Sequence, residues 1–373
     1  MRCLPQSKIS QIAGNALHDW HAEIVAIRAF NRWLLDSCRS LATAEAQQRG
    51  PNVEAGLDAS IWLRQRSPEE CIDSSPQPFA IRDDVEVFMY CSEAPCGDAS
   101  MELVMAAQDD ATPWAVPSQP KPSVESTASA ETVAEPSSLR GRGFFSELGI
   151  VRRKPSRSDA PPTLSKSCTD KIAQTQFLSL LSCTTSLVVH PGNAYVKSLV
   201  IPSSQLVPES VERAFGPSGR MKPLQESTLS DWTGGYRPRW LSAIPTCLEF
   251  EASRRQMTSQ PLIPSNLTAI YTPHFQETLI GGVLQGRKQF DPRGASKICR
   301  RGLLATVIEV ALIVGALEVA DLLKTSRYRD IKESGRLAPR RALKSEVRKV
   351  LAPDGWSRNV GDDEWSFHET DQA

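Results

Sequence analysis

Hydrophobic positions in the first half of the chain alternate between helical and strand spacing. Apolar residues recur three or four positions apart over residues 20–35, which predicts a helix with Asp19 at its N-cap and with His21 and Glu23 in its first turn. The apolar run 85–91 predicts a buried strand that Pro95-Cys96-Gly97 turns into a second helix. Residues 168–181 return to helical spacing, so we expect a third helix there.

The second half of the chain continues the mixture of strands and helices. Its pattern predicts strands at 194–201, 246–252, 267–271 and 277–283, and helices at 295–323 and 340–351. Strands interleaved with helices favour an α/β fold, a mixed sheet covered by helices, with a helical C-terminal part. We expect one domain over residues 1–373. Residues 111–138, rich in Pro, Ser, Thr, Glu and Ala, are predicted to be a flexible insertion outside the core.

Composition limits the class of protein only weakly. The chain has 373 residues, 40% of them hydrophobic, and 43 basic residues balance 43 acidic ones. Overall charge therefore gives no general attraction to nucleic acid, and an RNA-binding surface would need local segregation of charge. Such segregation is present, because the segment from Lys324 to Lys349 contains ten Lys or Arg and only three acidic residues. A solvated helix face and phosphate contacts with RNA are both compatible with it.

Cysteine usage indicates a reducing compartment. Nine cysteines lack regular spacing, and no charged-then-apolar leader precedes them, so we expect an intracellular protein of the cytoplasm or nucleus, without disulfides. The apolar run 303–319 is shorter than the ~20 residues of a membrane span and contains Glu309 and Glu318. We expect a buried helix there, no membrane association and no obligate protein partner.

Three short motifs supply the residues of a hydrolytic zinc site. They are His21-Ala22-Glu23, Pro95-Cys96-Gly97-Asp98-Ala99 and Ser167-Cys168-Thr169-Asp170-Lys171. One His and two Cys fit a catalytic zinc that keeps one position for water. Glu23 would remain free to carry protons, as in nucleobase deaminases.

More than two cysteines are candidates for the two thiol ligands. The usual deaminase motif Pro-Cys-x-x-Cys has Ala99 in its last position here, so Cys168, at the start of a predicted helix, is the candidate. Cys91 competes with Cys96, but as the end of a strand with alternating side chains it is expected to be packed. A His-x-Glu pair alone is usually a surface or capping pair, and only the two cysteine motifs make it a catalytic candidate.

The motifs together resemble the eukaryotic tRNA adenosine deaminase 1 family, which is related to the double-stranded-RNA adenosine deaminases. The resemblance implies the cytidine-deaminase-like fold and hydrolytic conversion of adenosine to inosine in tRNA-Ala, at the position 3′ of the anticodon (position 37). Family members usually have several dozen further residues before the position of Met1, which predicts an N-terminally truncated chain. The resemblance is carried by residues 14–23, 95–99, 140–143, 154–155, 159–165 and 167–171.

The resemblance also implies a structural inositol hexakisphosphate and an RNA-binding surface. Gln174 and Thr175 depart from the Arg and Trp of the double-stranded-RNA branch. The implied inositol phosphate residues are Asp19, Arg28, Lys171, Arg300, Tyr328, Lys332, Arg341 and Trp356, and the candidate RNA contacts are Asn15, Arg140, Arg142 and Lys154.

Two other functions remain open at this stage. The chain could deaminate adenosine in other structured RNA, or it could be a catalytically silent tRNA-binding protein with a structural zinc. The presence of Glu23 favours an enzyme.

Overall fold

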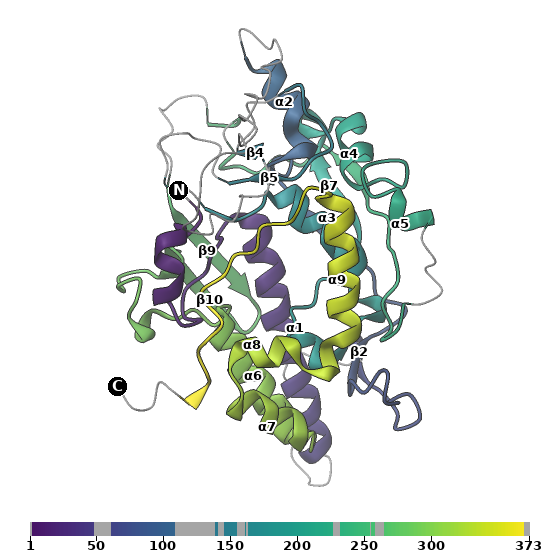
Figure 1. Ribbon diagram of the computed structural model, residues 1–373, viewed down its shortest axis with the longest axis vertical. Helices are drawn as coiled ribbons and strands as arrows, with labels where there is room; N and C mark the ends of the chain where they lie inside the picture. Colours follow the sequence, from purple (N-terminus) through teal and green to yellow (C-terminus); the bar gives the residue numbers. More distant parts are fainter. Residues whose placement is uncertain are drawn as a thin grey trace, which may run out of the picture.

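The long helix α1 (Ala22–Gln47) runs through the middle of the structure in the view of Figure 1. The structure, a computed structural model, describes residues 2–47, 61–108, 139–140, 145–154, 161, 163–226, 232–253, 255–257 and 265–368. Helix α1 packs against α6 (Arg300–Ile313) and strand β9 (Leu267–Thr272). Val25, near its start, is buried in one apolar cluster, and Leu34, Leu35 and Cys38, farther along, are buried in another. The helix therefore connects these two clusters.

The described strands form three three-stranded sheets and one two-stranded sheet. Strands β3 (Val87–Tyr90), β7 (Val196–Pro202) and β8 (Ser242–Thr246) are parallel and lie in the order β3-β7-β8. Strand β2 (Phe79–Ile81) pairs antiparallel with β1 (Leu63–Gln65) and parallel with β6 (Val189–His190). Strand β9 forms an antiparallel meander with β10 (Phe275–Ile280) and β11 (Val283–Leu284), and the short β4 (Leu139–Arg140) pairs with β5 (Arg152–Arg153). The architecture is therefore mixed α/β, as predicted.

Helices cover these sheets and dominate the C-terminal part, which also agrees with the prediction. Within the described residues, no helix combines the length and apolarity that crossing a membrane requires. The remaining helices are α2 (Met101–Ala106), α3 (Cys168–Leu178), α4 (Pro208–Phe215), α5 (Pro223–Glu226), α7 (Leu317–Thr325), α8 (Tyr328–Glu333) and α9 (Ala338–Leu351).

Several predicted boundaries need correction. The helix predicted over 20–35 begins at Ala22, so His21 directly precedes it, and Asp19 lies too far upstream to be its N-cap. The predicted helix 295–323 is two helices, because the chain turns at Gly315, whose φ of 72° ends α6 before α7 begins. The predicted strand 246–252 is wrong, since β8 ends at Thr246.

The expected buried strand at 85–91 has only one covered face. In β3 the side chains of Phe88 and Tyr90 are 49% and 44% exposed. Period-two alternation therefore describes this strand better than the continuous burial that its apolar composition indicated. The predicted insertion at 111–138 lies outside the described residues.

Three apolar clusters fix the elements that carry the chemistry. One joins α1 to α6 and α7, another joins α3 to β7, α4 and α9, and the third joins the N-terminal residues to β9 and β10. The start of α1 is held by the third cluster through Val25, whereas the turn before α2 and the start of α3 are both held by the second, through Ala99 and Ile172. Their relative positions depend on the packing of the whole fold.

The contact between α1 and α6 can be tested by truncating one buried leucine. Leu304 is 1% exposed, whereas Leu312 on the same helix is 45% exposed. We expect Leu304→Ala to lower the free energy of unfolding by about 2–5 kcal/mol, because it removes buried contacts and leaves a cavity. Leu312→Ala should change it by roughly 0.5 kcal/mol or less. Urea unfolding followed by circular dichroism measures both, and equal losses would contradict this packing.

Candidate active site

The two cysteine motifs meet where α3 begins. Cys168 is the first residue of α3, and its backbone N–H lies 3.4 Å from the Cys96 sulfur. Thr169 reinforces the contact, since its backbone N–H donates to the Cys96 carbonyl at 3.0 Å and its hydroxyl to the Pro95 carbonyl, also at 3.0 Å. The motifs are 72 residues apart in sequence. The fold thus brings together the two thiols that the sequence predicts as ligands.

Gly97 permits this close approach. Its φ is 111°, and a Cβ atom there would lie 2.3 Å from the Ser167 hydroxyl oxygen. The same hydroxyl accepts a hydrogen bond from the backbone N–H of Asp170 and so caps α3. A side chain at position 97 would therefore push the Cys96 turn away from the start of α3.

A hydrogen bond between the two thiols shifts their pKa values in opposite directions. The pKa of Cys96 is lowered to about 6, mainly because the Cys168 thiol donates a hydrogen bond to it, with Lys154 and His21 adding positive charge. Burial raises the pKa of Cys168 well above its usual value. The lowered pKa of Cys96 favours the thiolate form in which a cysteine binds a metal.

His21 and Glu23 stand at the start of α1 and act electrostatically on Cys96. Among the described residues, however, the ligand atoms that come within 4.8 Å of one another join His21 to Cys3 and Asp19 and not to Cys96 and Cys168. The Nδ1 atom of His21 lies 2.7 Å from Asp19, and the backbone N–H of His21 donates to the same carboxylate oxygen at 3.1 Å. Glu23 lies in the first turn of α1, close enough to the thiols to oppose the ionisation of Cys96 and Cys168 electrostatically. Imidazole, two thiols and a carboxylate therefore gather in one region, although their sequence positions run from 21 to 168.

Cys3 is a neighbour that the sequence did not reveal. Its sulfur lies 3.9 Å from His21 Nδ1, and within the described chain the ligand atoms of Cys3, Asp19 and His21 come within 4.8 Å of one another. These three residues form a second donor set that could hold a metal and shares His21 with the first. Burial raises the pKa of Cys3 to about 12, so this thiol is protonated at neutral pH.

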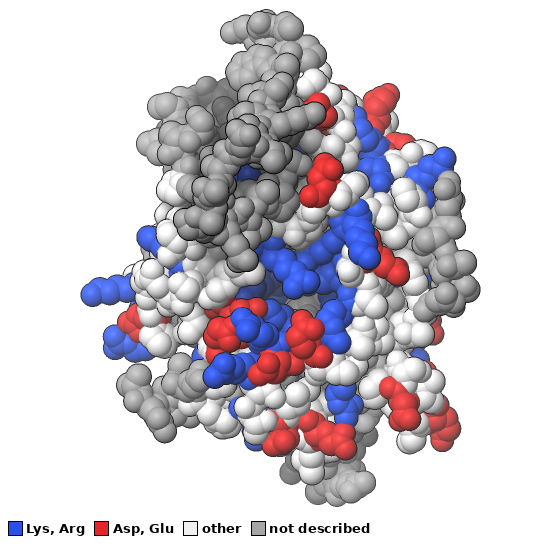
Figure 2. All heavy atoms as spheres, viewed as in Figure 1, with Lys and Arg blue, Asp and Glu red and all other residues white. Residues whose placement is uncertain are grey.

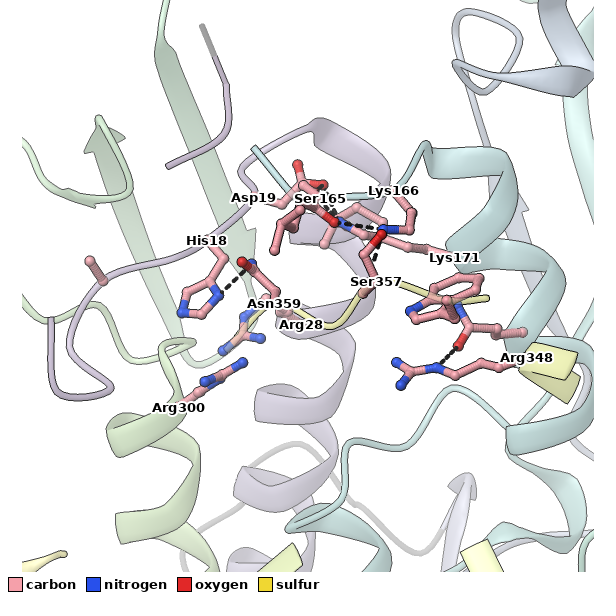
Figure 3. A pocket seen from close by; sticks show the side chains of 15 residues that line it. His18, Asp19, Arg28, Ser165, Lys166, Lys171, Arg300, Arg348, Ser357 and Asn359 are labelled. Carbon is pink, nitrogen blue, oxygen red and sulfur yellow. Dashed lines mark hydrogen bonds and ion pairs between the residues drawn. The ribbon is translucent and has the colours of Figure 1, made fainter. Parts of the chain in front are cut away.

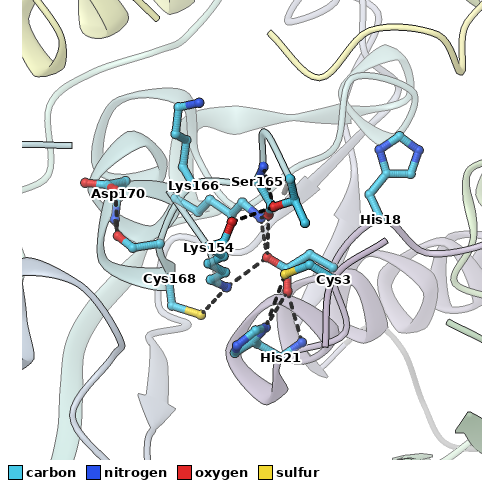
Figure 4. A network of polar contacts seen from close by, with 12 residues as sticks. Cys3, His18, His21, Lys154, Ser165, Lys166, Cys168 and Asp170 are labelled. Carbon is cyan, nitrogen blue, oxygen red and sulfur yellow. Dashed lines mark hydrogen bonds and ion pairs between the residues drawn. The ribbon is translucent and has the colours of Figure 1, made fainter. Parts of the chain in front are cut away.

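Asp19 connects the thiol region to the interior (Figure 4). Its carboxylate accepts hydrogen bonds from Lys154 at 2.8 Å, from the Ser165 hydroxyl at 3.0 Å and from Lys171. Lys154 also lies 3.1 Å from the Cys168 sulfur. Burial alone would raise the pKa of Asp19, but Lys171 and Lys154 hold it well below its usual range. Lys171 is thus joined to Cys168 by a continuous path of polar contacts through Asp19 and Lys154.

A positively charged cavity of about 260 Å³ begins on the other side of this network (Figures 2 and 3). Asp19 is the one carboxylate among its described lining residues, and two lysines already neutralise it. Arg28 and Arg300 lie on one side of the cavity and Arg348 on the other. The basic residues that line it are Arg28, Lys166, Lys171, Arg300 and Arg348.

Protonation within the cavity reflects this excess of positive charge. Burial lowers the pKa of Lys166 to about 8 and that of Arg348 to about 10, and neighbouring cations lower both further. Burial and the facing Arg300 lower the pKa of Arg28. His18, whose pKa burial lowers to about 4, is neutral. Burial among other cations therefore disfavours the charged forms of Arg28, Lys166 and Arg348, whereas Tyr328 and Asp362 raise the pKa of Arg300 against the effect of its burial. An anion would relieve the repulsion among the first three.

Five of the residues predicted for inositol phosphate line this cavity and three do not. Tyr328 stacks on Trp365 beneath Arg300, Lys332 pairs with Asp363 at 2.5 Å, and Arg341 donates to backbone carbonyls at the end of α8. Sequence reasoning missed Lys166 and Arg348, which lie on either side of Trp356. Lys166, two residues before Cys168, could have been noticed from its position. The five lining residues are Asp19, Arg28, Lys171, Arg300 and Trp356.

The candidate RNA contacts are placed differently from expectation. Lys154 and Asn15 are both buried, at 4% exposure, which argues against direct RNA contact by either side chain. Arg140 belongs to β4, and Arg142 lies outside the described residues. Cys91, the competitor for the metal, is buried as predicted.

Comparison with known proteins agrees with the arrangement of these motifs. The adenosine-deaminase (editase) domain model matches residues 1–350. The tRNA-specific adenosine deaminase 1 of Schizosaccharomyces pombe is 32% identical over 82% of this chain and 70% of that protein. The protein of the same name from Saccharomyces cerevisiae is 31% identical over 54% of this chain and 44% of its own length. The Homo sapiens protein is 28% identical over 29% and 17%.

These matches confirm the family that the three motifs indicated. The chain belongs to the adenosine-deaminase (editase) domain family.

Proposed function

We propose that this chain is a zinc-dependent hydrolase that converts adenosine to inosine in tRNA. The observation that carries the proposal is the contact between the Cys96 and Cys168 motifs beside His21 and Glu23, in a chain of the editase family. His21, Cys96 and Cys168 are the proposed zinc ligands, and Glu23 is the proposed proton carrier.

The donor set fits zinc. Two sulfurs and one imidazole nitrogen are the ligand types zinc prefers, and three protein ligands leave one position open. A zinc ion at this site would supply Lewis-acid activation of water. The alternative set of Cys3, Asp19 and His21 suits a cation less well, because Lys154 and Lys171 already occupy the Asp19 carboxylate.

The surrounding residues prepare the site. With a proton on Nδ1, His21 donates a hydrogen bond to Asp19, which fixes the ring. The lone pair of Nε2 is then free to bind a metal. Lys154 offsets the negative charge of the thiolates. Glu23, a half-buried carboxylate in the first turn of α1, is placed to take a proton from water and to deliver it to the departing amine.

We propose tRNA as the substrate because the relatives are named tRNA-specific adenosine deaminases. The finer choice, the adenosine 3′ of the anticodon in tRNA-Ala, follows from the resemblance of the motifs to that family. A base in an anticodon loop is easier to extrude into a deep site than a base in a duplex. An intracellular location is consistent with this substrate.

We also propose that the positively charged cavity holds inositol hexakisphosphate. Lys171 pairs with Asp19 and Arg300 with Asp362, but Arg28, Lys166 and Arg348 have no carboxylate partner among the described residues. Holding these three cations around a cavity of about 260 Å³ would be costly without an anion. A polyphosphate would pair with Arg28, Lys166, Lys171, Arg300 and Arg348, and the ring of Trp356 would form part of the wall. The path from Lys171 through Asp19 to Lys154 would then couple this anion to the Cys168 thiolate.

Replacement of Glu23 tests the enzymatic role. We expect Glu23→Ala to lower the rate of inosine formation in tRNA-Ala by at least ~10²-fold, because proton transfer is lost, while zinc content stays unchanged. Glu86→Ala, which removes an exposed carboxylate paired with Lys197, is the control and should keep full activity. Inosine sequencing and metal analysis measure both. Zinc-loaded wild-type protein that forms no inosine in any tRNA would favour a silent binding protein.

Cysteine replacements distinguish the two donor sets. Cys96→Ala and Cys168→Ala should each abolish stoichiometric zinc, because two ligands cannot hold the ion tightly. Cys3→Ala should retain zinc and activity, since that thiol is buried and protonated. Metal analysis after gel filtration gives the answer. Loss of zinc in Cys3→Ala with retention in Cys96→Ala would assign the metal to the alternative set.

The anion proposal predicts that one substitution reduces the stability of the ligand-bound protein much more than that of the ligand-free protein. Arg28→Met should weaken the stabilisation that added inositol hexakisphosphate gives, while the ligand-free protein should lose little stability because a repelled cation is removed. Binding at 100 times Kd should stabilise the wild type by about 2.7 kcal/mol. Thermal unfolding with and without the ligand measures this. Arg82→Met, at an exposed arginine paired with Asp84, is the control, and identical ligand-induced shifts in Arg28→Met and wild type would contradict the assignment.

A further inference from the structure

Two fully buried aspartates follow the two cysteines at the same interval. Asp98 lies two residues after Cys96, and Asp170 lies two residues after Cys168. Neither carboxylate belongs to a donor set described above. A buried carboxylate needs compensating partners, so the residues that satisfy it also fix the backbone that carries it.

Asp98 is held by a side chain of α4. The Nε of Arg213 lies 3.0 Å from the Asp98 carboxylate, and its Nη2 donates to the Asp98 carbonyl, also at 3.0 Å. The other carboxylate oxygen accepts the backbone N–H of Gly149 at 2.7 Å. Arg213 also pairs with Glu102 in α2, so one guanidinium binds both the turn after Cys96 and the helix that follows it.

Asp170 is held by the turn that follows α4. The Nη1 of Arg220 lies 2.7 Å from one carboxylate oxygen, while the other accepts the Ser167 hydroxyl at 2.5 Å and the backbone N–H of Arg152 at 3.0 Å. The Nε of Arg220 donates to the Ala214 carbonyl at 3.2 Å. The guanidinium therefore joins the first turn of α3 to the C-terminal end of α4.

A short rigid segment connects the two arginines. The backbone N–H of Arg220 donates to the Arg213 carbonyl at 2.9 Å. Gly219 permits this fold-back, because a Cβ there would lie 2.3 Å from the Glu212 carbonyl oxygen. We call Arg213, Arg220 and the backbone between them the arginine bridge.

We propose that the arginine bridge sets the separation of the Cys96 and Cys168 thiols and that Arg213 and Arg220 are positioning residues for the metal ligands. The inference rests on the proposed zinc site. Two sulfurs on one tetrahedral zinc must lie about 3.8 Å apart, given Zn–S distances of about 2.3 Å. Each arginine anchors the residue two positions beyond a ligand, and the backbone between them keeps these anchors at a fixed distance. Contacts behind metal ligands act in this way in other metal sites.

The test is cobalt binding to zinc-free protein, read as thiolate-to-cobalt charge-transfer absorption and as affinity against a chelator. We expect Arg220→Gln and Arg213→Gln to weaken Co²⁺ and Zn²⁺ binding by roughly 10- to 100-fold and to change the charge-transfer spectrum. Arg220→Lys should recover part of the affinity, because an ammonium can pair with Asp170 but cannot also reach the Ala214 carbonyl as Nε does.

Arg32→Gln is the matched control. Arg32 pairs with the buried Asp36 at 2.9 Å, and the exposed fractions of its pair, 12% and 2%, resemble the 5% and 0% of Arg220 and Asp170. This control should lose stability without changing the metal spectrum. Thermal unfolding of the zinc-free proteins shows whether each variant folds. Arg213, more exposed at 21%, keeps the test valid if the Arg220 variants do not fold.

The outcomes separate this inference from the proposed function. Folded Arg213→Gln and Arg220→Gln proteins with wild-type affinity and spectrum would overturn the positioning role while leaving the zinc site intact. Wild-type protein without thiolate-to-cobalt absorption would refute the proposed ligands themselves. Equal weakening in Arg32→Gln would show general destabilisation and would also overturn the inference.

Discussion

The buried carboxylate of Asp19 is the interaction on which the two halves of the site depend. It fixes the His21 ring on one side and pairs with Lys154 and Lys171 on the other. Removing it would leave the buried ammonium of Lys154 and the partly exposed ammonium of Lys171 without their main partner, and such a loss is far more costly than the pair is stabilising. The thiol region and the basic cavity are therefore one electrostatic unit.

The same principle explains the charge distribution around that unit. Lys166 and Arg348 in the cavity have lowered pKa values because they are buried among other cations, whereas each aspartate behind a cysteine is matched by an arginine. The first arrangement is unfavourable until an anion binds, and the second is complete within the chain. Ligand-dependent stability is thus expected at the cavity, and permanent rigidity behind the cysteines.

Local patterns predicted the regular elements well where the pattern was long. Helices α1, α3 and α9 and strands β7, β9 and β10 lie where periodicity placed them, with shifts of a few residues at most ends and a longer extension of α1. Short elements such as β2, β6 and α8 were missed because two to six residues carry too little periodicity. The break at Gly315 was missed because the apolar pattern continues through it.

The sequence by itself determined the family and the candidate site residues: His21, Glu23, Cys96 and Cys168 stand in motifs whose residue types and order indicate a deaminase, because those functional groups are few and specific. Only the tertiary structure decided which neighbours serve them. In the folded chain, Lys154, which was a candidate RNA contact, is a partner of Cys168, and Cys3 lies beside His21. Lys166 and Arg348 line the cavity. Such contacts join residues far apart in sequence, and their formation depends on the packing of several apolar clusters, which no local pattern records.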